Sequence, residues 1–389
     1  MSRVRRWGVA MAVALVAVGT VSAASAPSSS GVTTSQVNWP EFLHGPYHDG
    51  YDPSETALSP STVAKLRLDF RIATGSGVDS SPVVANGVLY FGTRSGYLYA
   101  ANATTGTVLW SRQLGGEVDS TPAVAKGVVY VGSADNKVVA YTVKGSRLWS
   151  FTTGGDVNSS PIVVNNVVYV GSFDDNMYAL NATTGTKLWS FTTGNWISDS
   201  PAVANGIVYF ESLDGGMYAV NATTGSLVWS SPGPYVWFNS PIVAGNSVFI
   251  NGVYSFNPTS GALQWHQSGG DDAYGSPAYG NGNLFVGDQG GGASPEVQAF
   301  RGSTGKLLWS FAIGGTVSSS PAVANGVVYI GAQNGVIYAL DESSGHQLWS
   351  YKTGSDILYS SPAVANGMVY IGSDNGSLDA FSLPAAPSS

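Results

Sequence analysis

The 389-residue sequence contains no cysteine and only four histidines, at positions 44, 48, 266 and 346. The lack of cysteine excludes disulfides, thiolate metal sites, a cysteine nucleophile and a lipidated N-terminal cysteine. His44 and His48 have the His-x-x-x-His spacing, but Gly45 stands where a zincin-type zinc site has its glutamate. Thiol chemistry and zincin-type metal chemistry are therefore excluded as functions.

Charged residues are also scarce. They make up 10% of the chain, against about 25% in an average protein, and the formal net charge is −8. An acidic surface repels phosphate backbones, so nucleic acid is excluded as a partner. In contrast, aromatic residues reach 12% and glycine occurs 50 times. Abundant Gly, Val, Tyr, Ser and Thr indicate many short strands joined by tight turns.

The N-terminus has the pattern of a secretory signal. Arg3, Arg5 and Arg6 precede an apolar run at 7–21, and Ala23 ends a small-residue cleavage pattern. The run is shorter than the about 20 residues that span a bilayer; a retained membrane anchor is the alternative. We predict a secreted or cell-envelope monomer without a membrane span, divided into a signal peptide at 1–23, a leader and N-terminal extension at 24–65, a propeller at 66–383 and a tail at 384–389.

A Ser/Thr-Pro pair recurs every 36–44 residues. Its prolines are Pro82, Pro122, Pro161, Pro201, Pro241, Pro277, Pro321 and Pro362. Within each unit, pairs such as Asn325-Gly326 favour two-residue hairpins, because both residues tolerate positive φ. The unit around them predicts strands after the Pro, at 327–330, at 338–340 and, in another copy, at 188–191. Four antiparallel strands per repeat of about forty residues are typical of a propeller blade, and the predicted fold is an all-β, eight-bladed propeller.

The last blade needs a strand from elsewhere in the chain. A tryptophan marks the fourth strand seven times, at Trp110, Trp149, Trp189, Trp229, Trp265, Trp309 and Trp349. The eighth unit ends near Leu383 after three strands. Residues 66–72 carry Phe70 at the spacing of those tryptophans from the following glycine. We therefore predict that this N-terminal strand completes the last blade and closes the ring without a long exposed edge.

The run Ala179–Trp189, ALNATTGTKLW, resembles the tryptophan-docking motif of the PQQ-repeat, quinoprotein-type propeller family. Similar runs end at Trp110, Trp229, Trp309 and Trp349, and the lead-in around Trp39 also resembles that family. The resemblance implies a structural role for the seven tryptophans. The family contains both dehydrogenases that use pyrroloquinoline quinone (PQQ) and Ca²⁺ and non-catalytic scaffolds such as BamB, so the fold leaves the function open.

Dehydrogenases of this family need cations for the three PQQ carboxylates, oxygen ligands for Ca²⁺ and an Asp base. The channel-facing window of each blade runs from about three residues before the repeat Pro to about four after it. In all eight windows the only basic residue is Lys126, at the far end of its strand. We therefore expect a non-catalytic binding or scaffold module at the cell surface, without a cofactor and with a protein or carbohydrate ligand. The alternative is a dehydrogenase that uses PQQ and Ca²⁺ to oxidise alcohols or sugars.

Two groups of residues are candidates for ligand binding. The residues three positions before each repeat Pro should surround one mouth of the channel: Asp79, Asp119, Asn158, Ser198, Phe238, Tyr274, Ser318 and Tyr359. Asp79 and Asp119 lie on neighbouring blades and are candidates to share a metal cation; solvated loop acids are the alternative. Blades four to six carry irregular loops on the same face, and their side chains are the candidates for a ligand-binding patch: Trp196, Tyr235, Trp237, Phe238, Asp271, Asp272 and Tyr274. Filling of gaps between irregular blades is the alternative for these rings.

Overall fold

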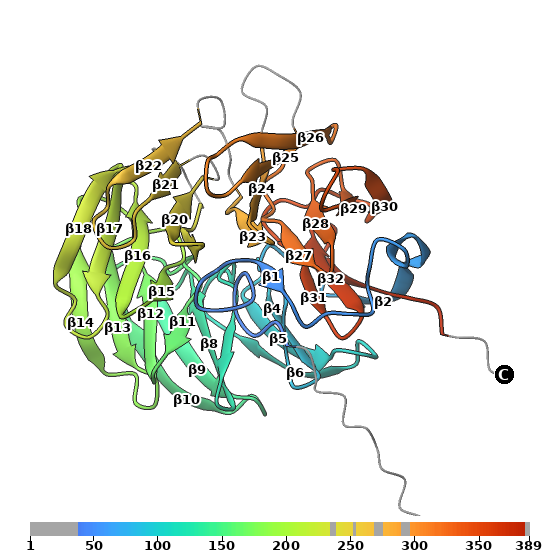
Figure 1. Cartoon of the computed structure of the whole chain (residues 1–389). Helices are drawn as coiled ribbons and strands as arrows, with labels where there is room; N and C mark the ends of the chain where they lie inside the picture. Colours follow the sequence, from blue (N-terminus) through green and yellow to red (C-terminus); the bar gives the residue numbers. More distant parts are fainter. Residues whose placement is uncertain (1–37, 234–238, 252–253, 268–274, 289–295, 386–389) are drawn as a thin grey trace, which may run out of the picture. The chain divides into compact units, whose positions relative to one another are not determined.

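A computed structural model describes residues 38–233, 239–251, 254–267, 275–288 and 296–385. These residues form eight sheets arranged as blades around a centre, which confirms the eight-bladed propeller (Figure 1). In the described part of the chain the only helical segment is the short 3₁₀ turn η1, Val63–Lys65. None of the described helical residues form a helix long and apolar enough to cross a membrane.

Each blade is built on four antiparallel strands, which in the first seven blades follow the chain from one edge to the other; in the seventh, β1 (Tyr51–Asp52) adds a parallel strand. The first four blades consist of β3 (Val83–Ala85), β4 (Val88–Gly92), β5 (Tyr97–Asn102) and β6 (Val108–Gln113); β7 (Ala123–Ala125), β8 (Val128–Ser133), β9 (Lys137–Thr142) and β10 (Arg147–Thr152); β11 (Ile162–Val164), β12 (Val167–Gly171), β13 (Asn176–Asn181) and β14 (Lys187–Thr192); and β15 (Ala202–Ala204), β16 (Ile207–Ser212), β17 (Gly216–Asn221) and β18 (Leu227–Pro232).

Blades five to eight continue the pattern, and two N-terminal strands join the last two blades. They consist of β19 (Ile242–Ala244), β20 (Ser247–Ile250), β21 (Tyr254–Phe256) and β22 (Leu263–His266); β23 (Ala278–Gly280), β24 (Asn283–Gly287), β25 (Glu296–Arg301) and β26 (Leu307–Ala312); β27 (Ala322–Ala324), β28 (Val327–Gly331), β29 (Val336–Asp341) and β30 (Gln347–Lys352) with β1 (Tyr51–Asp52); and β31 (Ala363–Ala365), β32 (Met368–Ser373) and β33 (Ser377–Ser382) with β2 (Arg67–Ala73).

The predicted hairpins form between the first and second strands. Asn325 and Gly326 adopt φ values of 45° and 82°, the left-handed conformation that a type I′ turn requires. Each first strand follows the repeat Pro, and first strands of most neighbouring blades contact one another around the centre. The Pro ring therefore stands at the inner ends of the sheets, where no ladder hydrogen bond is lost.

Tryptophans connect each blade to the next, and apolar side chains of the second and third strands fill the spaces between blades. Each indole N–H donates a hydrogen bond of 2.9–3.0 Å to a carbonyl of the following blade: Trp110 to Val143, Trp149 to Ala182, Trp189 to Ala222, Trp229 to Pro258, Trp265 to Gly302, Trp309 to Glu342 and Trp349 to Leu66. Gly185 illustrates why glycine follows in the docking turn, because a Cβ there would lie 2.6 Å from the Trp149 ring.

The N-terminal strand closes the ring as predicted. β2 pairs antiparallel with β33, and its bounds differ by one residue from the predicted strand. Phe70 takes the place of the missing eighth tryptophan, since a Cβ on Gly106 of the first blade would lie 2.4 Å from its ring. The first and last blades are therefore joined through a segment from the start of the chain.

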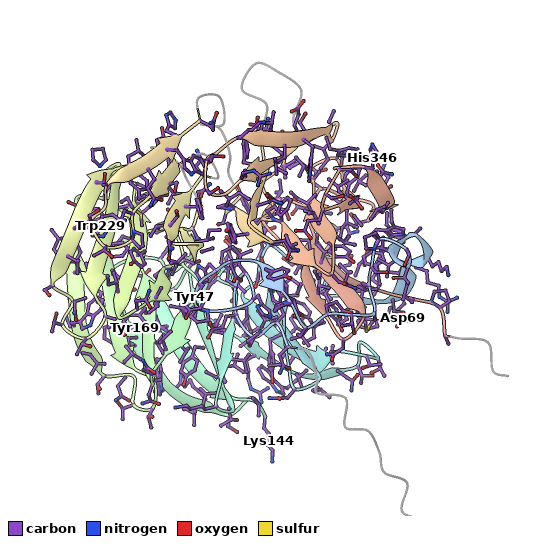
Figure 2. The ribbon with its side chains drawn as sticks, viewed as in Figure 1. Tyr47, Asp69, Lys144, Tyr169, Trp229 and His346 are labelled. Atoms are coloured by element: carbon purple, nitrogen blue, oxygen red, sulfur yellow. The ribbon has the colours of Figure 1, made fainter. Side chains whose placement is uncertain are left out.

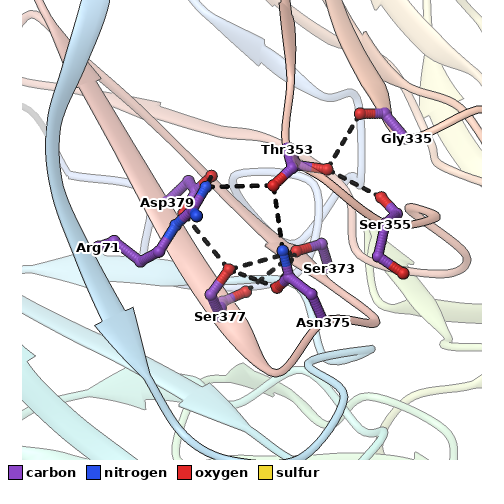
Figure 3. A network of polar contacts seen from close by, with 8 residues as sticks. All are labelled: Arg71, Gly335, Thr353, Ser355, Ser373, Asn375, Ser377 and Asp379. Carbon is purple, nitrogen blue, oxygen red and sulfur yellow. Dashed lines mark hydrogen bonds and ion pairs between the residues drawn. The ribbon is translucent and has the colours of Figure 1, made fainter.

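An ion pair with a buried carboxylate strengthens this closure (Figure 3). Arg71 Nε and Nη2 donate to the two carboxylate oxygens of Asp379, both at 2.6 Å. Arg71 Nη2 also donates to the Thr353 carbonyl at 3.2 Å, in the loop that follows the seventh blade. Asp379 is 1% exposed, whereas the Arg71 side chain is partly exposed, and this bidentate contact ties β2, β33 and the seventh blade together.

Candidate functional site

The segment at 38–58, which we call the N-terminal strap, runs around the centre of the ring (Figure 1). In Figure 2 its Tyr47 lies near the centre, whereas Trp229, His346 and Lys144 lie at the periphery. Carbonyls of the strap accept hydrogen bonds from the amides two residues after successive repeat prolines: Val84 to Trp39, Val124 to Pro40, Val203 to Pro46, Val243 to Tyr47, Tyr279 to Asp49 and Val323 to Gly50.

Side chains of the strap complete this circuit. Burial raises the pKa of Glu41 to about 8, and the nearby Val163 backbone of the third blade opposes this rise in the pKa. In the eighth blade the Gly367 amide donates to Glu55 Oε2 at 2.8 Å. The strap thus contacts all eight blades in chain order and satisfies inner-edge amides that would otherwise be left without a partner.

A pocket, which we call the well, lies inside the ring beside the strap. Its cavity volume is about 100 Å³, and Phe42 of the strap contributes to its lining. The remaining lining comes from the residues up to three positions before the repeat prolines: Asp79, Ser81, Asp119, Thr121, Asn158, Ser160, Ser198, Asp199, Ser200, Ser240, Ser318, Ser320, Tyr359 and Ser361. Six of the predicted mouth residues are therefore found around one cavity, while Phe238 and Tyr274 lie outside the described residues.

A closed ring of hydrogen bonds surrounds the well. The residue before each repeat Pro donates its amide to the hydroxyl of its counterpart in the next blade at 2.8–3.2 Å: Ser81 to Thr121, Thr121 to Ser160, Ser160 to Ser200, Ser200 to Ser240, Ser240 to Ser276, Ser276 to Ser320, Ser320 to Ser361 and Ser361 to Ser81. This circle explains the Ser/Thr that precedes every repeat Pro: only a small hydroxyl side chain accepts that amide at the channel wall.

Asp79 and Asp119 both line the well, but their surroundings differ. Arg94 Nε donates to Asp79 Oδ2 at 2.5 Å, and Arg94 Nη2 lies 3.1 Å from Asp374 Oδ1. Burial raises the pKa of Asp79 to about 7, although Arg94 opposes this. Burial, with the nearby Glu117 charge, raises the pKa of Asp119 to about 6. Asp79 is buried, whereas Asp119 is half-buried.

The fourth blade departs from the others at the wall of the well. In several blades a serine two residues before the repeat Pro accepts the amide of a glycine twelve positions later, as Ser159 Oγ does from Gly171 at 3.0 Å. In the fourth blade Asp199 and Glu211 occupy these two positions. Glu211 is 3% exposed, and neither of its carboxylate oxygens has a hydrogen-bond partner among the described residues. Burial, and secondarily the charge of Asp199, raises the pKa of Glu211 well above its usual range.

Of the predicted ligand-binding patch, Trp196 lies within the described residues. Its ring stacks on Phe173 of the third blade, with centroids 4.8 Å apart and planes 4° from parallel. It remains 42% exposed. The other members of the patch lie outside the described residues: Tyr235, Trp237, Phe238, Asp271, Asp272 and Tyr274. The patch as a whole stays a prediction.

Sequence reasoning missed Arg94 and Glu211. Arg94 follows the second strand of its blade and therefore lies outside the channel-facing windows. Its side chain nevertheless extends to the mouth of the channel, where it contacts Asp79. Glu211 did carry a signal, because six other blades have glycine at this position, at or next to the end of the second strand: Gly92, Gly132, Gly171, Gly287, Gly331 and Gly372. The fifth blade has Asn251 at this position, so only the fourth places a carboxyl there, which indicates a local change in the packing of neighbouring blades.

The residues around the well do not suit PQQ. Its described lining includes Asp79, Asp119 and Asp199 and no basic side chain, so a tricarboxylate would meet like charge. The undescribed internal segments at 234–238, 252–253, 268–274 and 289–295 contain no Lys or Arg. No group of three acidic or histidine side chains is placed to hold a metal ion in the described part of the chain, so a multidentate carboxylate site for Ca²⁺ is not found there either.

The sequence profile described as "Outer membrane protein assembly factor BamB" matches residues 18–161, 139–252 and 251–384. The chain belongs to this PQQ-repeat propeller family. Among curated proteins, lupanine 17-hydroxylase [cytochrome c] from Pseudomonas sp is 32% identical over 107 residues. That match covers 27% of this chain and 15% of the relative, so the family assignment rests on the repeats and not on the hydroxylase as a whole.

Solved structures of a dehydrogenase and of a BamB protein both share the fold of this chain. A europium-containing methanol dehydrogenase matches with a TM-score of 0.77 and 14% identity over 89% of this chain and 98% of that chain. BamB from Moraxella catarrhalis matches with a TM-score of 0.67 and 17% identity over 83% of this chain and 99% of that chain. At these identities the likeness concerns the fold alone and leaves the choice between scaffold and dehydrogenase to the site.

Proposed function

We propose that this protein is an extracytoplasmic, monomeric binding or scaffold module without its own catalytic chemistry, and that its ligand engages the face on which the well opens. The observation that carries the proposal is the well itself. Acids and hydroxyls line it, its volume is about 100 Å³, and no basic side chain appears in its described lining. These features suit recognition of a partner group and oppose an anionic quinone.

Two further observations support this role. The BamB family profile covers the chain from residue 18 to 384, and BamB is described as an assembly factor. The N-terminal basic and apolar pattern supports export from the cytoplasm. We propose a protein or carbohydrate partner that also touches the patch containing Trp196, because exposed aromatic side chains are enriched at recognition surfaces.

The test against a dehydrogenase is direct. The purified full chain is mixed with PQQ and CaCl₂, and binding is followed by absorbance and by dye-linked oxidation of methanol, ethanol and glucose. We expect neither saturable PQQ binding nor turnover. Saturable binding with turnover would overturn the proposal in favour of a dehydrogenase, and a known quinoprotein dehydrogenase assayed in parallel controls for cofactor quality.

The partner-binding role is tested in the native cell. Fractionation is expected to place the protein in the envelope or the medium, and affinity capture from the envelope is expected to retain a specific partner. Replacing Trp196 by alanine should weaken that capture, whereas replacing Tyr47, an exposed aromatic on the strap side, should leave it unchanged. Equal capture by the Trp196 variant would remove the aromatic patch from the proposal.

A further inference from the structure

We propose that the well binds an organic ammonium group, carried either by a small amine or by a lysine side chain of a partner protein. This inference deepens the proposed function and rests on it. It names the chemistry that the well recognises, which neither the family nor the comparisons assign. Unsatisfied oxygens, the local charge balance and the arrangement of the acceptor oxygens support it.

Three side-chain oxygens in the well have no partner. Asp79 Oδ1, Asp119 Oδ1 and Asn158 Oδ1 are buried and accept no hydrogen bond from the described residues. They stand at the same position of three successive repeats, and all three side chains line the same cavity. Asp79 as a whole is only 5% exposed. Buried acceptors without donors are unfavourable, so this row of oxygens lacks the donor that would satisfy it.

The acidic side chains around the well outnumber the basic ones, so the local charge also favours a cationic ligand. Asp79, Asp119 and Asp199 line the well, and Glu211 lies within electrostatic reach of Asp199 behind the wall. Among the described residues Arg94 is the only basic side chain within salt-bridge distance of any of these acids, and it is shared with Asp374. The internal segments that are not described contain no Lys or Arg. A ligand that enters this well therefore gains most if it brings a positive charge.

An ammonium group fits the arrangement better than a metal ion. The acceptors come one from each blade along the wall, and no three acidic or histidine side chains among the described residues converge on one point. An ammonium group has three donors that can be shared among separated oxygens. Phe42 and Tyr359 also line the well and add aromatic surface against which the alkyl stem of an ammonium ligand can pack. The volume of about 100 Å³ holds such a head group and a short stem.

The experiment is calorimetric titration of the full chain with n-butylammonium chloride at pH 7.5, with 1-butanol as the uncharged control ligand. We expect saturable binding of the ammonium and none of the alcohol. Asp119→Asn should weaken ammonium binding about tenfold or more, because a hydrogen bond to a charged group is lost. Asp69→Asn, which removes the same charge from an exposed site on β2, should leave the affinity within about twofold.

A second variant changes affinity in the opposite direction. Asn158→Asp adds a carboxylate to the same row and should tighten butylammonium binding. The short peptide acetyl-Gly-Lys-Gly-amide, titrated beside butylammonium, separates the two sources: tighter peptide binding supports a lysine of a partner protein, and tighter butylammonium binding supports a small amine.

The proposal is overturned by absent butylammonium binding, by equal affinity in Asp119→Asn, or by CaCl₂ that binds saturably and displaces the ammonium. These outcomes are distinct from failure of the proposed function. Loss of the ammonium site without PQQ turnover leaves a binding module with another ligand, whereas PQQ-dependent turnover removes the module itself.

Discussion

Asp119→Asn should make the ligand-free protein more stable at neutral and alkaline pH. The side chain lies in the wall of the well, where its Oδ1 has no partner among the described residues and Glu117 adds a repulsive charge. Asparagine has nearly the same shape and no charge. The substitution therefore removes an unfavourable ionisation and leaves the packing of the second blade intact.

The magnitude follows from the pKa of Asp119, which is raised from 3.8 to about 6. Each tenfold change in proton affinity is worth about 1.4 kcal/mol, so the ionised carboxyl destabilises the fold by at most about 3 kcal/mol. The pKa is higher in the folded state than in the unfolded chain. The destabilisation is therefore absent below pH 3.8, grows as the pH rises towards 6 and is complete above it. Because the new amide has its own donors to satisfy, we expect a gain of about 1 to 3 kcal/mol at pH 8.

Equilibrium unfolding in urea at pH 4 and pH 8 measures this difference. The variant should unfold at higher urea than the parent at pH 8, and the two curves should nearly coincide at pH 4. Asp69→Asn serves as the control, since that carboxyl is exposed and should give no comparable gain. A variant that is less stable at pH 8, or equally stabilised at both pH values, would refute the reasoning. Loss of ammonium binding in the same variant would show that the acid is kept for recognition at the expense of stability.

Three further sets of substitutions test the contacts that build the ring, each by urea unfolding. Ser200→Ala leaves the amide of the preceding blade without its acceptor at the channel wall and should cost about 1 to 2 kcal/mol, while Ser200→Thr should restore stability; equal loss in both would argue against the hydroxyl ring. Trp189→Phe and Tyr169→Phe each remove one of the two donors to the Ala222 carbonyl, so each should cost about 1 kcal/mol. The double variant leaves that carbonyl without a donor and should cost more than the sum of the two, whereas strict additivity would contradict a shared acceptor. Asp379→Ala leaves the partly exposed Arg71 guanidinium without its carboxylate at the closure and should cost about 1 to 2 kcal/mol, because water can still reach Arg71. A loss below about 0.5 kcal/mol would show that the ion pair does not stabilise the ring.

Much of the fold was predictable because its information is repeated and local. Pro277 and its seven counterparts mark the inner strands, and Asn-Gly pairs such as Asn205-Gly206 specify hairpins by backbone conformation alone. The closing strand at 67–73 was also predictable, since Phe70 keeps the spacing of the tryptophans. Strand bounds differed by one or two residues, as expected where ladders end gradually.

The site was only partly predictable. The mouth positions Asp79, Asp119 and Asn158 followed from the repeat, because equivalent positions of equal blades must surround one axis. The charge state and the partners of these side chains did not follow from the repeat. Arg94 converts Asp79 into one half of an ion pair, although nothing in the spacing of these two residues indicates that they meet.

The sequence by itself determined the number of blades, their order and the partner of the last one, because a repeated period and turn chemistry act within about forty residues. Tertiary structure alone decided which residues of the strap contact each blade, which acids lie close to one another and which buried oxygens remain without donors. These contacts join residues that are far apart in the chain, and they exist only after the ring has closed and excluded water from its centre.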